Sequence, residues 1–160
     1  MTLSLRTIAT FALLVAPCVA LASGAENSCL EKTCPAGTKA TTYAKKSEPF
    51  FACPTIDLAE YSNFVVGLVQ MGAAFGSLPN ISLVTGEPEY QGETKVLLDQ
   101  MRKRANVSTF DEAVATCIKG KNGVKVLVAN NPVDRSVLWV QADKTGEMFW
   151  MPKANLDVRR

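Results

Sequence analysis

Histidine is absent from the 160 residues of this chain. Without an imidazole, nucleophilic catalysis of the Ser-His-Asp or Cys-His type is excluded, and so are the usual zinc sites. No glycine-rich phosphate-binding loop is present. An excess of one charge is also missing, because 17 Lys and Arg balance 15 Asp and Glu, which excludes a strong field for binding nucleic acid. These absences favour a non-catalytic protein that uses no metal and no cofactor.

The N-terminal segment has the layout of a secretory signal. Arg6 supplies a positive charge, residues 8–16 form a short apolar run, and small residues precede a cleavage position between Ala22 and Ser23. The run is too short for a membrane-spanning helix, which needs roughly 20 apolar residues. Residues 1–22 are therefore predicted to be a signal peptide, and residues 23–160 a single exported domain in the periplasm or secreted.

Four cysteines remain after cleavage: Cys29, Cys34, Cys53 and Cys117. In an exported chain this number predicts two disulfides, and three connectivities are possible. A redox motif fits less well, because four residues separate Cys29 and Cys34, where a thioredoxin-like motif has two.

The C-terminal part of the chain reads as three strands at residues 124–129, 137–142 and 147–151. The first begins with the apolar and polar alternation of a half-buried strand. The other two are apolar on both faces, at residues 137–140 and 148–151. Such strands must be covered on both faces, one of which can fill a barrel interior while the other needs a helix or a partner protein.

This block resembles an SH3 domain, eukaryotic or bacterial, in a strand that starts with Trp, a turn with Gly, an aromatic residue, and a Pro-x-x-Asn-Leu ending. The matching residues are Trp139, Gly146, Trp150, Pro152, Asn155 and Leu156. The resemblance implies a small barrel that binds a protein or a cell-wall component. Two features depart from it: no acidic, Tyr-rich loop precedes Val124, and the first strand of the barrel is missing from its usual place.

Two early segments can supply the missing strand, namely residues 38–43 and 50–53. We therefore expect an α+β fold: a small SH3-like barrel, possibly split, with a helical insert of two to three helices packed on it. The strands at 27–54 would pair with those at 118–157, and residues 55–117 would form the insert. Cys53 and Cys117 would then bracket this insert.

The longest predicted helix covers residues 55–75, with Thr55 as its N-cap. Its apolar residues recur at helical spacing and predict the face that covers the strands; they are Tyr61, Phe64, Val65, Leu68 and Met71. From Phe64 to Leu78 polar residues are rare, and Gly72 and Gly76 form a Gly-x-x-x-Gly pattern known from membrane helices. Membrane association through this stretch is the alternative to the buried core helix that its length favours.

Two further helices are predicted. Residues 93–105 form the first, with Val96, Leu97, Met101 and Ala105 facing inward and the basic residues 102–104 at its negative end. Thr109 and Glu112 form a capping box that starts the second, which ends near Cys117.

The residues most indicative of binding are aromatic or lie in the polar loop 79–92. They are Trp139, Phe149, Trp150, Tyr43, Glu87, Glu89 and Tyr90. Aromatic anchors dominate protein interfaces, although the long helix can equally cover these rings, and the loop carboxylates can simply be solvated.

The leading hypothesis is an envelope-assembly subunit or binding module that recognises a protein or peptidoglycan. An inhibitor or immunity-type protein that inserts residues 87–92 into its target is one alternative. A cell-wall hydrolase using Glu87, Glu89 or Glu93 is the other, because glycosidases use paired carboxylates.

Overall fold

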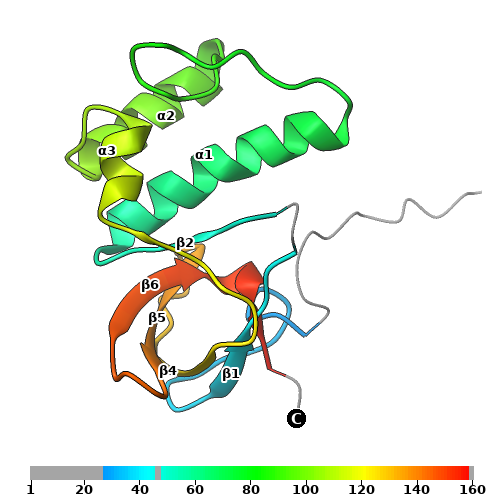
Figure 1. Cartoon of the computed structure of the whole chain (residues 1–160), viewed down its shortest axis with the longest axis vertical. Coiled ribbons are helices and arrows are strands. Elements are labelled where there is room, and N and C mark those ends of the chain that lie inside the picture. Colours follow the sequence, from blue (N-terminus) through cyan, green and yellow to red (C-terminus); the bar gives the residue numbers. More distant parts are fainter. Residues whose placement is uncertain (1–26, 46–47, 159–160) are drawn as a thin grey trace, which may run out of the picture.

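The computed structural model describes residues 27–45 and 48–158, in which a curled antiparallel sheet lies on one side and three helices on the other (Figure 1). The elements follow in the order β1 (Lys39–Thr42), β2 (Phe51–Ala52), α1 (Ile56–Ala74), α2 (Gly92–Arg104), α3 (Phe110–Ala115), β3 (Ile118–Lys119), β4 (Lys125–Asn130), β5 (Val137–Ala142), β6 (Met148–Pro152), the 3-10 turn η1 (Lys153–Asn155) and β7 (Leu156–Asp157). The predicted α+β class is confirmed. The predicted signal peptide and its cleavage position lie outside the described residues.

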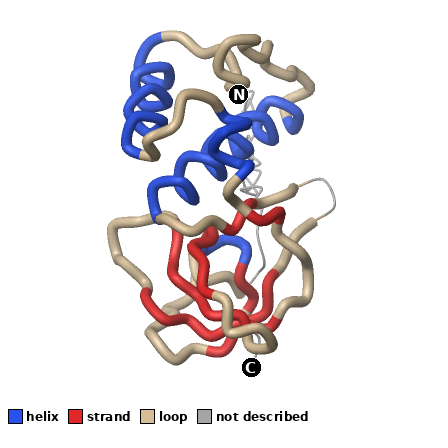
Figure 2. The backbone as a smooth tube through the Cα atoms, turned by 60° about the vertical axis from the view of Figure 1, so that its left-hand side comes forward, coloured by secondary structure: helices blue, strands red, loops and turns tan. Residues whose placement is uncertain are grey.

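Early and late strands pair with each other in the five-stranded sheet. Its order is β6-β5-β4-β1-β7, so β1, the first strand of the chain, lies between β4 and β7. β1 runs antiparallel to β4, with Ala40 opposite Val126. At the outer edge of β6, Cys53 and Trp150 exchange backbone hydrogen bonds of 2.9 and 2.8 Å. These bonds hold Cys53, the residue after β2, against β6. The sheet thus curls into a half-barrel, with all three helices on one side of it (Figure 2).

The interior of the half-barrel follows the alternation of the strands. Alternate residues of β4, β5 and β6 are buried in one apolar cluster, to which β1 and β7 also contribute: Ala40, Val126, Val128, Leu138, Val140, Met151 and Leu156. On the opposite face, Val137 and Trp150 belong to a second cluster with α1. The prediction that a helix covers strands apolar on both faces is therefore confirmed at this end of the sheet.

The two disulfides join Cys29 to Cys34 and Cys53 to Cys117, with S–S distances of 2.04 and 2.09 Å. The first closes a small loop before β1. The second connects the residue after β2 with the end of the helical segment, 64 positions later. It joins the ends of the segment that holds the three helices, as expected for cysteines that bracket an insert.

Helix α1 begins as predicted, with the side chain of Thr55 accepting a 3.3 Å hydrogen bond from the Leu58 amide. Tyr61, Val65 and Leu68 form its buried face, but Met71 is half exposed. Only the part of α1 up to Leu68 therefore behaves as the predicted core helix, because no residue of the helix after Leu68 is buried. Within the residues that the structure describes, no helix combines the length and apolarity required to cross a membrane.

The prediction for the face of α2 is wrong in part. Val96 is 56% exposed and Leu97 40%, whereas Leu98 and Met101 are buried against the helical cluster. Residues 98, 101 and 105 recur at a helical spacing of three and four, so they share one face. Val96 lies on the other side of the helix, and Leu97 lies at the edge of that face. α3 starts at the predicted cap: Thr109 accepts a bond from the Glu112 amide, and the Glu112 carboxylate accepts one from Ser108.

Gly72 lies in the last turn of α1, close to the chain that follows the helix. The Ser77 amide donates to the Gly72 carbonyl at 2.9 Å, and Gly76 takes a positive φ of 73°, which together form a Schellman C-cap. A Cβ on Gly72 would lie 2.6 Å from the Ser77 oxygen and 2.8 Å from Pro79 Cδ. The small residue is therefore required by the turn that folds back on the helix.

This close approach predicts opposite outcomes for two glycines of α1. Gly67→Ala has free space around the new methyl group and should stabilise the protein by about 0.5–1 kcal/mol, since glycine is a poor helix former. Gly72→Ala should destabilise it by about 1–3 kcal/mol, because the backbone must shift. Urea unfolding of both variants measures the difference. Equal effects would show that the turn after α1 does not constrain the helix.

Candidate functional site

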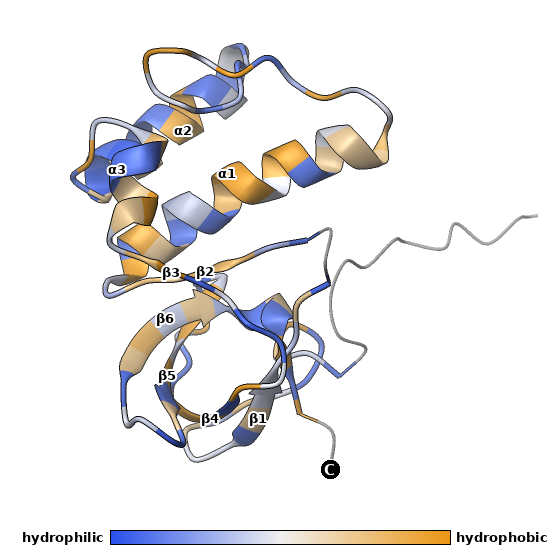
Figure 3. Ribbon diagram, viewed as in Figure 1, coloured by the Kyte–Doolittle hydropathy of each residue, from blue (hydrophilic) through white to orange (hydrophobic). Residues whose placement is uncertain are grey.

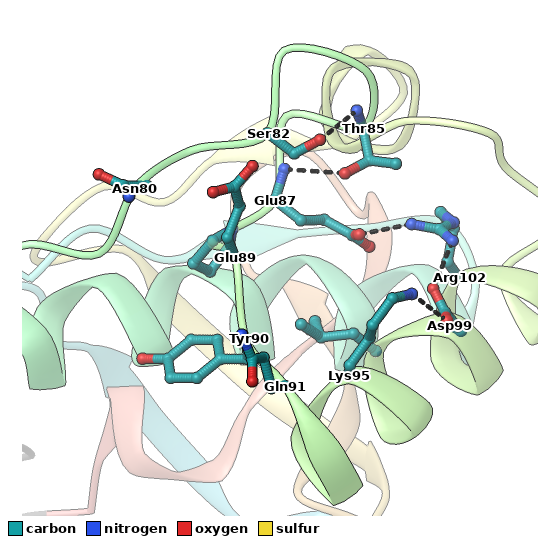
Figure 4. A pocket seen from close by; sticks show the side chains of 12 residues that line it. Asn80, Ser82, Thr85, Glu87, Glu89, Tyr90, Gln91, Lys95, Asp99 and Arg102 are labelled. Atoms are coloured by element: carbon teal, nitrogen blue, oxygen red, sulfur yellow. Dashed lines mark hydrogen bonds and ion pairs between the residues drawn. The ribbon is translucent and has the colours of Figure 1, made fainter.

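An open pocket of about 510 Å³ lies between α2 and the loop that joins α1 to α2 (Figure 4). Its lining is mostly polar and consists of Asn80, Ser82, Thr85, Glu87, Pro88, Glu89, Tyr90, Gln91, Lys95, Leu98, Asp99 and Arg102. Three of the predicted binding residues, Glu87, Glu89 and Tyr90, are thus brought together. Glu93 is not part of the lining.

Glu87 is buried, which corrects the expectation of a solvated loop carboxylate. Its side chain is only 7% exposed. The Tyr61 hydroxyl donates to one carboxylate oxygen at 2.7 Å, and the Arg102 guanidinium donates to the other. Burial of a charge is tolerated when it is paired and hydrogen-bonded, as it is here.

The network continues along α2. Arg102 donates its second nitrogen to Asp99 at 2.6 Å, and Lys95 donates to the other oxygen of Asp99 at 2.6 Å. The hydrogen bond from Lys95, with the charges of Lys95 and Arg102, holds the pKa of Asp99 below its usual range. Burial, followed by the neighbouring Glu87 carboxylate, raises the pKa of Tyr61 well above its usual value, so the hydroxyl remains a donor. Two cations and two carboxylates therefore alternate in this network, and Glu89 adds a third carboxylate to the pocket lining.

This arrangement holds the loop against α1 and α2 through Glu87. Both oxygens of Glu87 accept hydrogen bonds from residues of the helices, which fix the orientation of this carboxylate. A glycosidase uses two carboxyls across a cleft. Glu89 and Asp99 also line this pocket, and Asp99 is bound by Lys95 and Arg102. Among the described residues, no group of three or more His, Cys, Asp or Glu side chains is placed to hold a metal ion.

A second candidate surface lies on the outer face of the sheet. Trp139 and Trp150 are neighbours across β5 and β6, and their ring centroids are 5.1 Å apart with the planes tilted by 44°. Trp150 also packs on the helical cluster. Among the described residues, Trp139 belongs to neither buried cluster and is half-buried.

Apolar side chains flank this pair in the sheet register. Gln141 of β5 lies opposite Met148 of β6 on one side and opposite Leu127 of β4 on the other. Met148 and Leu127 are both exposed, and alternation places them on the same side as Trp139. We call Leu127, Trp139, Met148 and Trp150 the outer aromatic face.

The two remaining aromatic candidates are not part of this face. Phe149 points the opposite way from Trp150 and packs on the interior cluster of the half-barrel, so it is a core residue. Tyr43 follows β1, on the far side of β4, where its backbone pairs with Asn155 through hydrogen bonds of 2.8 and 3.0 Å.

Sequence reasoning missed the partners of Glu87. Tyr61 was assigned only to the core face of a helix and Arg102 only to a helix end, and no local pattern links them to position 87. The helical spacing of Tyr61 nevertheless predicted correctly that its side chain is buried. No protein family, curated protein or solved structure matches the chain, so its function has to be inferred from the geometry of these two surfaces.

Proposed function

We propose that the protein is an exported, non-catalytic binding module, built on an SH3-like half-barrel, that recognises a protein partner in the cell envelope. Two disulfides support an oxidising compartment, since such bonds form and persist there. Glu87, buried and bonded through both oxygens to Tyr61 and Arg102, supports a structural role for this carboxylate.

The half-buried Trp139, which lies outside both core clusters, is the observation that carries this proposal. A tryptophan that stacks on Trp150 is held in one position, so little conformational entropy is lost when a partner covers it. Large aromatics of this kind are the commonest anchors of protein interfaces. Exposed Met148 and Leu127 extend the apolar surface around it. Peptidoglycan remains the second candidate, because sugar rings also stack on tryptophan.

Trp139→Ala tests the proposal in the full mature protein, tagged and crosslinked in its native envelope. Losing an interface anchor typically costs about 2 kcal/mol or more, which corresponds to a roughly 30-fold weaker complex. We therefore expect the stoichiometric protein captured by the wild type to be lost with Trp139→Ala. Its affinity for the wild type and for the variant is then measured with purified proteins.

Tyr43→Ala is the matched control, because Tyr43 is half-buried too and lies outside the outer aromatic face. It should retain the partner, and thermal unfolding should show that both variants are folded. Retention of the partner by Trp139→Ala would disprove the role of this face. Recovery of wall fragments without protein would instead identify peptidoglycan as the ligand.

A further inference from the structure

Residues 80–89 form a braced hairpin in the loop between α1 and α2. Ile81 pairs with Pro88, the Ser82 amide donates to the Glu87 carbonyl at 2.8 Å, and the Glu89 amide donates to the Asn80 carbonyl at 2.8 Å. The turn is closed by the Gly86 amide, which donates to the Ser82 carbonyl at 2.8 Å. Gly86 takes a φ of 70°, a conformation that favours glycine.

All three helices anchor this hairpin. Glu87 binds Tyr61 of α1 and Arg102 of α2, and the Thr85 carbonyl accepts a 2.7 Å bond from the Phe110 amide at the start of α3. Such anchoring gives a surface loop a single conformation, with little entropy left to lose on binding.

The tip of the hairpin carries apolar side chains into solvent. Leu83 is 103% exposed and Val84 81% exposed. Apolar residues in this loop lie at the end of the molecule distant from the sheet (Figure 3). Neither side chain contributes to the two buried clusters of the described residues, so the fold itself does not require them.

We propose that Leu83 and Val84 form a second binding site, which inserts into a concave apolar pocket of a partner protein. A convex, preorganised tip with a fully exposed leucine matches the shape and chemistry of such a pocket. The inserting residues are therefore 83 and 84, and not the acidic residues 87–92, because Glu87 points inward and braces the hairpin from below.

A protein fits this site better than a lipid surface does. Segments that bind membranes combine apolar residues with Lys and Arg that attract anionic headgroups. Residues 47–94, which include α1 and the whole hairpin, contain neither Lys nor Arg. This site also does not depend on the outer aromatic face, since different residues and elements form it.

Photo-crosslinking in the native envelope tests the proposal. A benzophenone amino acid is placed at Val84 and, as the matched control, at Val133, which is 99% exposed in the loop between β4 and β5. We expect one protein adduct from position 84 that is absent from position 133. Equal adducts at both positions, adducts with lipid alone, or no protein adduct at position 84 would each overturn the proposal.

The protein recovered from position 84 is then purified and titrated with the full mature chain. The double variant L83S/V84S should bind at least 30-fold more weakly than the wild type, with an unchanged thermal unfolding midpoint because both side chains are exposed. V133S should bind as the wild type does.

Wild-type affinity for L83S/V84S would contradict a protein pocket. So would binding of the wild type to phosphatidylcholine–phosphatidylglycerol vesicles that L83S/V84S loses. Trp139→Ala should leave this affinity unchanged, so failure here and failure of the outer aromatic face are distinguishable.

Discussion

Replacing Cys53 and Cys117 together by alanine should lower the free energy of unfolding by about 4 kcal/mol, on the chain-entropy estimate for a closed loop of this length. The disulfide closes a loop of 64 positions that contains all three helices. Without it, the unfolded chain gains the freedom that the bond had removed. Urea unfolding at neutral pH, followed by circular dichroism, measures the loss as a shift in the midpoint.

The other disulfide supplies the matched control. Cys29 and Cys34 close a loop of only 5 positions, so their replacement by alanine should cost about 2 kcal/mol on the same estimate. The order of the two losses is the test. If removal of the short loop costs as much as removal of the long one, loop closure does not explain how the second disulfide stabilises the fold.

Arg102→Met is the substitution with the next largest expected effect. Of the two side chains that donate to the buried Glu87 carboxylate, it leaves only the Tyr61 hydroxyl among the described residues. Removing one partner of a buried ion pair costs about 3 kcal/mol, because the other charge stays buried without compensation. Chemical denaturation of the variant measures the loss, and hydrogen exchange should show faster opening of residues 80–89.

Two further variants separate the buried charge from the lost arginine side chain. Combining Arg102→Met with Glu87→Gln removes the charge while keeping an oxygen for Tyr61, and should recover most of the lost stability. Lys95→Met breaks only the exposed pair with Asp99 and should change little, since exposed ion pairs contribute little. A loss with Lys95→Met equal to that with Arg102→Met would show that Glu87 is not the critical charge.

Local signals in the sequence predicted the parts of the fold that local interactions determine. The N-caps at Thr55 and Thr109 depend on hydrogen bonds that span three residues, and both occur as expected. The strands apolar on both faces required a cover, and α1 supplies it over Trp150. The C-terminal block lacked one strand of the expected barrel, which predicted that an early strand pairs with it, and β1 does so.

The incorrect predictions concern contacts between distant residues. Glu87 lies 26 positions from Tyr61 and 15 from Arg102, so nothing in the loop itself indicates that its carboxylate is buried. Val96 and Leu97 were placed inward because they are apolar, but the rotation of α2 is set by Leu98 and Met101 against the helical cluster. The outer aromatic face was predicted only as individual rings, because its grouping depends on the sheet register.

The position of β1 between β4 and β7 has a consequence for how the chain is made. A polypeptide that leaves the ribosome or crosses a membrane from its N-terminus exposes Lys39–Thr42 long before Lys125–Asn130 and Leu156–Asp157 arrive to pair with it. Pairing across such separations is slow, because the intervening chain must first be ordered. The three helices and the Cys53–Cys117 bond, in contrast, lie within residues 53–117, and only Val137 and Trp150 of their cluster come later. The half-barrel is thus the last part of the molecule to be completed during biogenesis, because β1 pairs only after β4 and β7 have been made.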